Sequence, residues 1–403
     1  MQGNVIVGQS GGPTAVINAS LAGVFFASKD AGVKNIYGMV NGIEGLLKGK
    51  ILNLSDYLKT EEDVELLKTT PAAFLGSCRY KLPKDNQEVF QKIFDFLEEK
   101  EIKTFIYIGG NDSMDTILQL SQYGEKINSP IRFIGVPKTI DNDLPVTDHT
   151  PGFGSAAKYV ATAIKEIIAD CNVYDMDAVT IVEIMGRNAG WLTAAAALSK
   201  GEDCVGPDLI YLPESVFDAE KFLEKVDQIR KKKKTVVVAV SESLTNEKGE
   251  YLCESLIHQS ADSFGHKILS GTAMVLADLV NDRLGIKARG IVLNTTQRCA
   301  AHIASKTDVE EAFLAGSEAI YAAEKGESGV MIVFERISDH PYQIECKTYD
   351  IGKIANIEKT VPDEFITETR DGICDTFMDY CRPLIMGETS VIYENGLPKH
   401  LTR

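Results

Sequence analysis

The chain has 403 residues, 44% of them hydrophobic and 25% charged, and this length exceeds the usual size of a single hydrophobic core, so we expect two domains. Its formal net charge of −16 argues against a nucleic-acid partner, which needs a basic face, and no apolar run approaches the ~20 residues that span a bilayer. The eight cysteines are scattered without a Cys-x-x-Cys pair, which indicates reduced thiols and a cytoplasmic protein.

Strand-like apolar runs alternate with amphipathic stretches of helical spacing along most of the chain. The predicted strands are 5–7, 104–108, 131–136, 179–184 and 235–240. The predicted helices are 15–28, 87–99, 114–123, 155–171 and 219–229. Because strands that alternate with helices usually form a mostly parallel sheet covered on both faces, the sequence predicts an α/β fold.

Two glycine-rich runs follow predicted strands. The first, from Gly8 to Gly12, lies between the first strand and the first helix. Two interpretations of it stay open, an anion cradle at a helix N-terminus or a tight strand-to-helix turn. The second run, Gly109-Gly110-Asn111-Asp112-Ser113, follows the strand 104–108 in the same way. Since open α/β sheets bind ligands at the carboxyl ends of their strands, two such loops favour a phosphate site.

A third run, 137–143, reads Pro-Lys-Thr-Ile-Asp-Asn-Asp and follows the strand 131–136. An Asx-rich turn would explain its acidic and amide residues, but it would not require Lys138 directly before Thr139. A lysine beside carboxylates suits phosphoryl transfer, in which the lysine neutralises phosphate charge and a carboxylate binds Mg²⁺ or accepts a proton. Because the overall field of the chain repels anions, we expect Arg and Lys to dominate in the cleft.

Two further loops carry candidate ligand contacts. Met185-Gly186-Arg187 follows the strand 179–184, where the glycine lets a ligand approach and the arginine offers a planar fork suited to phosphate. The alternative is a glycine-rich turn with a solvated arginine. Glu242 follows the strand 235–240, where a carboxylate can accept hydrogen bonds from sugar hydroxyls. Taken alone, Glu242 would be an ordinary loop residue.

Together these runs resemble the phosphofructokinase family over nearly the whole chain. Asp112 and Lys138 resemble its pyrophosphate-dependent branch, since ATP-dependent bacterial members usually have glycine at both places. The implied reaction is reversible, Mg²⁺-dependent transfer of a phosphoryl group from pyrophosphate to the 1-hydroxyl of fructose 6-phosphate. The resemblance rests on the order and spacing of Ser10-Gly11-Gly12, Phe74 to Arg79, Gly109 to Ser113, Thr139 to Asp143, Met185-Gly186-Arg187, Glu242 and Gln297-Arg298.

The resemblance implies a role for each matching residue. Asp141 would be the general base on the 1-hydroxyl, and Lys138 and Asp112 would complete the catalytic set. The implied donor contacts are Gly11, Gly12, Arg79, Gly110 and Lys138. Asn111 is the implied metal ligand. The implied sugar-phosphate contacts are Thr139, Asp141, Met185, Gly186, Arg187, Glu242, Arg289, Thr295 and Arg298.

Three positions depart from the family pattern. Asn111 stands where the family commonly has a metal-associated aspartate, so a neutral amide oxygen would have to hold Mg²⁺ or a bound water. Ala178 lies where an ATP-dependent bacterial relative has an arginine that reaches into the site of a neighbouring subunit. Thr295 stands where such relatives have a histidine. We therefore expect substrate contacts across the subunit interface to differ in this chain.

The resemblance also implies the architecture, two Rossmann-like three-layer domains with the active site in the cleft between them. The donor domain would take residues 1–145 and about 299–365, and the sugar-phosphate domain would take about 146–298 and 366–403. A homodimer or homotetramer is implied. Two alternatives stay open, an ATP-dependent phosphofructokinase that tolerates Lys138 and a non-catalytic regulatory subunit on the same fold, which Asn111 would suit.

Overall fold

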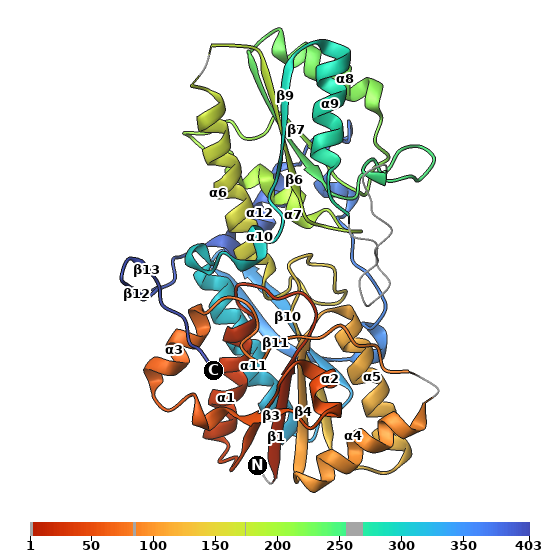
Figure 1. Ribbon diagram of the computed structural model, residues 1–403, viewed down its shortest axis with the longest axis vertical. Helices are drawn as coiled ribbons and strands as arrows, with labels where there is room; N and C mark the ends of the chain where they lie inside the picture. Colours follow the sequence, from red (N-terminus) through yellow and green to blue (C-terminus); the bar gives the residue numbers. More distant parts are fainter. Residues whose placement is uncertain (1–2, 84–85, 174, 255–268) are drawn as a thin grey trace.

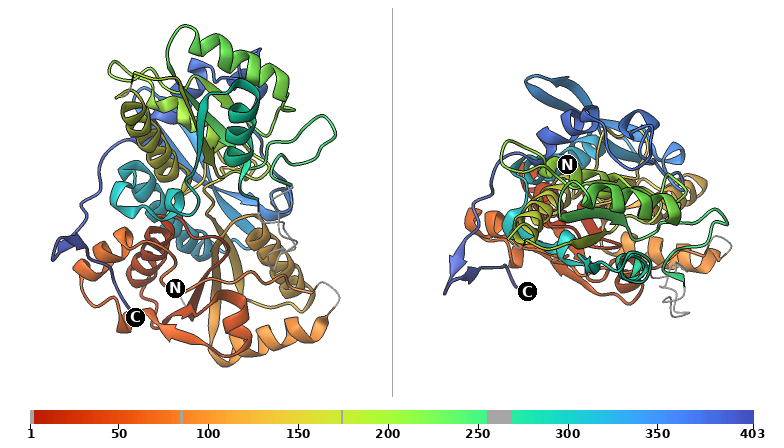
Figure 2. Two further views of the ribbon diagram at one scale, coloured as in Figure 1. Left: turned by 45° about the horizontal axis from the view of Figure 1, so that its top comes forward. Right: turned by 90° about the horizontal axis from the view of Figure 1, so that it is seen from above.

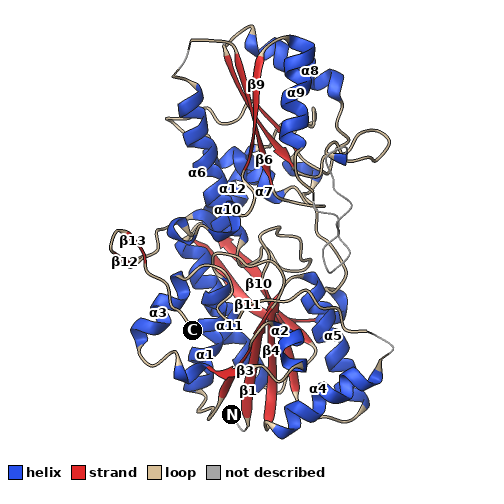
Figure 3. Cartoon of the chain, viewed as in Figure 1, coloured by secondary structure: helices blue, strands red, loops and turns tan. Residues whose placement is uncertain are grey.

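The computed structural model describes residues 3–83, 86–173, 175–254 and 269–403, which form two domains arranged along one long axis (Figure 1). A seven-stranded sheet lies at the centre of the first domain and a four-stranded sheet at the centre of the second (Figure 3). Helices cover both faces of each sheet. The predicted α/β class with two three-layer domains is therefore confirmed.

The first domain is built from segments at both ends of the chain. Its strands are β1 (Asn4–Gln9), β2 (Ile36–Met39), β3 (Ile51–Asn53), β4 (Ile102–Gly109), β5 (Arg132–Pro137), β10 (Val330–Asp339) and β11 (Tyr342–Asp350). Its helices are α1 (Ile17–Asp30), α2 (Gly42–Leu47), α3 (Glu61–Thr69), α4 (Gln87–Glu99), α5 (Asn111–Lys126) and α11 (Lys306–Glu324). The strand order is β11-β10-β5-β4-β1-β2-β3, in which only the β2–β3 and β10–β11 pairs are antiparallel.

One face of this sheet is covered by α1 and α11, which approach each other closely because each presents a glycine to the other. A Cβ atom on Gly23 would lie 2.0 Å from the carbonyl oxygen of Phe313, and one on Gly316 would lie 2.0 Å from that of Ser20. Larger residues at these two positions would force the helices apart. The opposite face packs against α2, α4 and α5.

The second domain comes mainly from the middle of the chain. Its strands are β6 (Ala178–Ile184), β7 (Leu209–Tyr211), β8 (Thr235–Ser241) and β9 (Lys287–Val292), which pair in parallel in the order β7-β8-β6-β9. Its helices are α6 (Phe153–Cys171), α7 (Trp191–Ala194), α8 (Ala219–Arg230), α9 (Thr272–Leu284), α10 (Thr296–Cys299) and α12 (Asp375–Cys381). Helices α8 and α9 cover one face.

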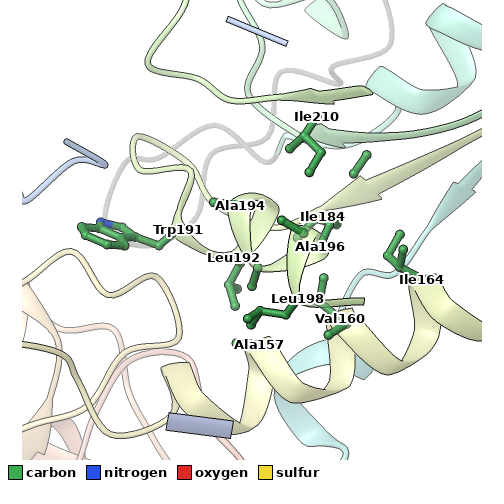
Figure 4. Close-up of a cluster of buried hydrophobic side chains, with 14 of the residues drawn as sticks. Ala157, Val160, Ile164, Ile184, Trp191, Leu192, Ala194, Ala196, Leu198 and Ile210 are labelled. Carbon is green, nitrogen blue, oxygen red and sulfur yellow. The ribbon is translucent and has the colours of Figure 1, made fainter. Parts of the chain in front are cut away.

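The other face of the second sheet carries a core that reaches toward the first domain. Ile184 and Ile210 of the sheet pack in the same cluster as Val160 and Ile164 of α6 (Figure 4). The cluster continues to Trp191, whose ring contacts aromatic rings of the α12 region. This core fixes the start of α7 directly after the loop that carries the predicted sugar-phosphate residues.

The chain passes between the domains after β5, after β9 and after β11, so it crosses more than once, as expected. The final segment carries a small hairpin of β12 (Tyr393–Glu394) and β13 (Leu397–Pro398) and runs along the first domain (Figure 2). There the backbone N–H of Leu401 donates to the hydroxyl of Thr70 at 2.9 Å. The end of the predicted 366–403 segment thus contacts the first domain, and the exact domain boundaries stay a prediction.

Every strand and helix expected from the sequence is present, with ends that differ by a few residues. The chain contains further strands that were not predicted, among them β2, β3, β7, β9 and the β10–β11 hairpin. In the part of the chain that the structure describes, no helix combines the length and apolar character needed to cross a membrane.

Candidate active site

A cavity of about 590 Å³ opens between the two domains, at the carboxyl ends of β1, β4, β5, β6 and β8. This volume is typical of small-molecule sites, which occupy roughly 300–1,000 Å³. Parallel register explains the convergence, because β1, β4 and β5 end side by side, as do β6 and β8. The predicted residues that line the cavity are Gly11, Gly12, Arg79, Gly110, Asn111, Asp112, Lys138, Thr139, Asp141, Met185, Arg187, Glu242 and Arg298.

The loop between β1 and α1 is held from behind by residues 74–79. The backbone N–H of Gly11 donates to the carbonyl of Cys78 at 3.2 Å, and the hydroxyl of Ser77 donates to the carbonyl of Gly11 at 2.6 Å. A Cβ atom on Gly12 would lie 2.9 Å from a guanidinium nitrogen of Arg298. Gly8 and Gln9 end β1, and the turn that follows presents Gly11 and Gly12 to the cavity. The role of this run as an anion cradle stays a prediction.

Lys138 lies against this glycine loop. Its Nζ donates to the carbonyl oxygen of Gly12 at 2.7 Å, and the residue is only 3% exposed. Burial lowers the pKa of Lys138 to about 8, although the carboxylates of Asp141 and Asp143 favour the charged form. The ammonium group is thus held in place at the cavity wall, where it can neutralise negative charge on a ligand.

The loop after β5 directs two carboxylates into the cavity. The hydroxyl of Thr139 accepts a hydrogen bond from the backbone N–H of Asp141 at 3.0 Å. Asn142 has a φ of 52°, and its amide donates to the hydroxyl of Tyr380 at 3.1 Å, away from the cavity. Asp141 and Asp143, on either side of Asn142, both line the cavity. Burial, followed by repulsion from Asp143, raises the pKa of Asp141 to about 7.

The second domain contributes the loop after β6. The carbonyl of Gly186 accepts hydrogen bonds from the hydroxyls of Ser241 and Ser243 at 2.9 and 2.8 Å, and its N–H donates to Glu242 at 3.4 Å. Gly186 has a φ of 144° and shapes this loop without lining the cavity itself. The loop therefore presents Met185 and Arg187 to the cavity beside Glu242. Burial, followed by repulsion from Asp141, raises the pKa of Glu242 to about 8.

Arg298 reaches the cavity because hydrogen bonds hold the preceding residue, Gln297, in place. The buried side chain of Gln297 accepts a hydrogen bond from the backbone N–H of Met185 at 3.3 Å and donates to the carbonyl of Asn294 at 2.9 Å. Burial and the nearby Arg79 both lower the pKa of Arg298. Since Arg298 also approaches Gly12, it lies between the glycine loop and the loops of the second domain.

Positive charge does not dominate the cavity by number. The cations that line it are Arg79, Lys81, Lys138, Arg187 and Arg298, and the carboxylates are Asp112, Asp141, Asp143, Glu242 and Glu358. As a count over the described residues, the expectation from the sequence was wrong. Positive charge can still prevail near neutral pH, because burial raises the pKa of Asp141 to about 7 and that of Glu242 to about 8, which removes part of their negative charge. Burial raises the pKa of Asp143 as well.

Arg289 does not line this cavity. It lies in the first half of β9, which runs parallel to β6. This position is therefore toward the amino ends of the strands, whereas the cavity lies at their carboxyl ends. Its guanidinium contacts Asp170 and the hydroxyl of Thr180, each at 3.2 Å. There it lines a second cavity of about 320 Å³ together with Ala178. Within one chain, the structure therefore contradicts a contact between Arg289 and a ligand in the central cavity.

Thr295 is also outside the central cavity. It is an exposed residue at the N-terminus of the short helix α10, where its carbonyl accepts a hydrogen bond from the N–H of Arg298 at 3.1 Å. The tight turn that carries Arg298 inward leaves Thr295 on the outside. The predicted contact of Thr295 with the sugar phosphate is not made within one chain.

The structure adds cavity residues that the sequence patterns did not indicate. Lys81 lies 3.2 Å from the carboxylate of Asp112. Asn356 and Glu358 belong to the segment that crosses from the first domain to the second after β11. Asn111 lines the cavity, but both polar atoms of its side chain bond to the main chain of residues 356 and 357. The metal-binding role of Asn111 stays a prediction.

The fold is that of the phosphofructokinase family. The family model described as Phosphofructokinase matches residues 4–323, and the chain belongs to that family. It is 40% identical over 407 residues to the pyrophosphate–fructose 6-phosphate 1-phosphotransferase of Methylococcus capsulatus, with 99% of this chain and 95% of the relative covered. It is 34% identical over 369 residues to the sulfofructose kinase of Alkalicoccus urumqiensis, with 91% and 92% covered.

A solved structure also supports membership of the phosphofructokinase family. The crystal structure of the pyrophosphate-dependent phosphofructokinase from Nitrosospira multiformis superimposes with a TM-score of 0.90. The two chains are 39% identical, and the match covers 99% of this chain and 96% of the other. Both domains are therefore shared with this relative.

Proposed function

We propose that the chain transfers a phosphoryl group from pyrophosphate to the 1-hydroxyl of fructose 6-phosphate, reversibly, giving fructose 1,6-bisphosphate and phosphate. The observation that carries this proposal is the meeting of Lys138, Asp112 and Asp141 in one interdomain cavity. The relatives at about 40% identity are pyrophosphate-dependent and support the same donor.

Asp141 acts as the general base. Its carboxylate lies in the cavity, and a pKa raised to about 7 suits a group that must take a proton near neutral pH. As the 1-hydroxyl of the sugar attacks the nearer phosphorus atom of pyrophosphate, its proton passes to Asp141 and phosphate leaves on the far side. Lys138 stabilises the charge on the transferring and departing groups. Thr139 orients Asp141 through its hydrogen bond to the backbone N–H.

The donor binds against the first domain and the sugar phosphate against the second. Gly11, Gly12 and Gly110 allow close approach of the donor phosphates, and Arg79 adds a cation. Arg187 and Arg298 hold the 6-phosphate, while Met185 and Glu242 contact the sugar. We assign residues 1–145 and about 299–365 to the donor domain, and about 146–298 and 366–403 to the sugar-phosphate domain.

We propose Mg²⁺ as the cofactor, with Asp112 and Asp143 as the side chains that hold it. An oxygen of Asp143 is buried without a hydrogen-bond partner, so it is free to bind a cation. No cluster of three or more acidic, histidine or cysteine side chains suited to a metal occurs among the described residues. Mg²⁺ commonly keeps several waters and takes other ligands from substrate phosphates, so a sparse protein set is sufficient. Bound to pyrophosphate, it would neutralise charge on the phosphate oxygens.

Arg289 is proposed to act in the active site of a neighbouring subunit, within a homodimer or homotetramer. It lies on the edge strand β9 and lines the second cavity with Ala178. By the family resemblance, Ala178 stands where an ATP-dependent bacterial relative has an arginine that reaches into the site of a neighbouring subunit. Thr295 is exposed on the surface, three residues before Arg298, and is a second candidate for such a contact. The eight free cysteines suit the reducing cytoplasm expected from the sequence.

The test is a turnover assay of the purified chain with fructose 6-phosphate and Mg²⁺, supplied with either pyrophosphate or ATP. We expect turnover with pyrophosphate and little with ATP. A preference for ATP would favour the ATP-dependent alternative, and no turnover with either donor would favour a regulatory subunit. Sulfofructose should be tested as a second acceptor, because one relative is a sulfofructose kinase.

A further inference from the structure

The crossing from β11 toward α12 passes beside the cavity through residues 356–361, here called the bridging segment. Asn356 and Glu358 of this segment line the cavity between loops of the two domains. None of its residues belongs to a motif that relates the chain to its family. Its side chains and main chain nevertheless bond to the donor-side loop, to the loop of Asp141 and to the loop of Arg187.

At the donor side, the bridging segment is held by Asn111, the first residue of α5. The Oδ1 atom of Asn111 accepts a hydrogen bond from the backbone N–H of Asn356 at 2.5 Å, and its Nδ2 donates to the carbonyl of Ile357 at 2.7 Å. The amide therefore pairs with the main chain as a neighbouring strand would. An ionised aspartate at this position can accept the first bond but cannot donate the second, and it would turn an oxygen toward the carbonyl of Ile357.

At the acceptor side, the bridging segment is held by the second domain. The amide of Asn188 donates to both carboxylate oxygens of Glu358, at 3.0 and 2.9 Å. The indole N–H of Trp191 donates to the carbonyl of Lys359 at 3.0 Å. The backbone N–H of Lys359 donates to the carbonyl of Asp143 at 2.7 Å. One short segment thus contacts the loops that carry donor, base and acceptor residues.

We propose that Asn111 is a positioning residue rather than a cation ligand. Its amide holds the bridging segment, and through that segment it fixes the donor-side loop of the first domain relative to the Asn188 loop of the second. This role of Asn111 in assembling the cavity wall does not depend on the substrate, and only its kinetic test rests on the proposed function. It replaces the metal-binding role expected for Asn111 from the family resemblance.

The substitution Asn111→Asp separates the two roles, because they predict opposite signs. A cation ligand would gain a charged oxygen, so the Mg²⁺ concentration for half-maximal activity would fall. A positioning residue would lose its donor to Ile357, so kcat/KM for pyrophosphate should fall roughly tenfold or more, without tighter Mg²⁺ dependence. Misfolding is not expected to produce this result, because a carboxylate in the first turn of α5 is favoured by the helix dipole.

The matched control is Asn128→Asp, which makes the same chemical change just beyond the other end of α5. Asn128 is exposed and does not line the cavity. Its φ of 54° is a conformation that aspartate also tolerates. This variant should keep the turnover and Mg²⁺ dependence of the parent.

Trp191 gives a readout that needs no turnover, because it is the only tryptophan of the chain and bonds to the bridging segment. In Asn111→Asp, its fluorescence should shift or become more accessible to acrylamide, while Asn128→Asp should match the parent. This measurement tests the positioning role even if the chain uses another substrate. Unchanged fluorescence in Asn111→Asp would overturn the proposal.

A double-mutant cycle tests whether the bridging segment couples the two domains. Asn111→Asp removes one hydrogen bond and Asn188→Ala removes the pair to Glu358, at opposite ends of the same segment, so their effects on kcat/KM should be less than additive when combined. Fully additive losses would overturn the coupling, and tighter Mg²⁺ dependence in Asn111→Asp would restore the metal-ligand role.

Discussion

The two walls of the cavity differ in what they present to a ligand. On the first-domain side, Gly11, Gly12 and Gly110 line the cavity, so main-chain groups can approach a ligand closely. On the second-domain side, no glycine lines it in the described part of the chain, and long side chains such as Arg187 and Glu242 do so instead. A small, fully charged donor suits close packing against main chain and a fixed cation, whereas a sugar phosphate suits varied side chains. The four predictions that follow test this division.

The largest effect is expected at Asp141, where the two walls meet. Asp141→Asn should lower kcat by at least ~10²-fold, the usual range for loss of a general base, and should weaken sugar binding much less. Because the pKa of Asp141 is raised to about 7, the parent should lose kcat/KM as the pH falls below about 7 and the base becomes protonated. Steady-state kinetics over pH 5.5 to about 9 provide the measurement. Near-normal turnover of a folded Asp141→Asn variant would remove Asp141 from the mechanism.

The next effect concerns donor choice on the first-domain wall. Lys138→Ala should lower kcat with pyrophosphate by roughly 10²-fold, because a fixed cation no longer stabilises the transferring group. Asp112→Gly should instead raise kcat/KM for ATP roughly tenfold, because it removes the repulsion between the Asp112 carboxylate and the α-phosphate of ATP. Two like charges ~4 Å apart repel by about 4 kcal/mol at an effective dielectric of ~20, and the neighbouring Lys81 offsets only part of this repulsion. The two donors are compared in the parent, both variants and the double variant. An Asp112→Gly variant with unchanged use of ATP would contradict this account of donor selection.

A smaller effect should distinguish Arg187 from Arg298. Arg187→Ala should raise KM for fructose 6-phosphate roughly tenfold and leave KM for pyrophosphate nearly unchanged, because a charged hydrogen bond to the sugar phosphate is lost. Arg298→Ala should raise both KM values, since its guanidinium also lies beside Gly12. An effect of Arg187→Ala confined to pyrophosphate would place it on the donor wall and break the division between the two walls.

The smallest effect is expected for Glu242→Gln at pH 7. Because burial and Asp141 raise the pKa of Glu242 to about 8, the free protein carries mostly the neutral acid at this pH, and glutamine has nearly the same shape. We expect KM for fructose 6-phosphate to change by less than about threefold at pH 7. Above pH 8 the parent ionises and the variant cannot, so the two KM profiles should diverge. Parallel profiles across this range would show that the ionisation of Glu242 has no role in sugar binding.

The strands and helices that the sequence predicted are those with long apolar runs or clear amphipathic spacing, such as β4 and α6. Most of the missed strands lack such signals, although β10 begins with an apolar run from Val330 to Phe334. The strand β2 has only four residues, and β11 alternates half-buried and exposed residues along its length. Their pairing depends on contacts with β1 and β10, which sequence periodicity does not encode.

The residues of the active site were also predictable only where the local sequence carries a pattern. Lys138 and Asp141 lie in a dense local motif, so their presence at the cavity was predictable from the sequence. Asn356 and Glu358 follow no predicted element, and the bond from Asn356 to Asn111 joins residues 245 positions apart. Arg289 matched the family pattern, but it lies in the first half of β9, and only the sheet topology shows that this is the end of the strand away from the central cavity. Local patterns identify loops at strand ends, whereas long-range connections determine which of them meet.

Because α11 lies far along the chain from α1, the close packing of these two helices can form only late in synthesis. The ribosome releases β6 to β9 before Lys306, so the second sheet has all its strands while the first domain still lacks α11, β10 and β11. In that interval β5 has an unpaired edge, to which another nascent chain can add, and cross-linking of chains stalled before Val330 would detect such pairs. The sheet that begins first is therefore finished last.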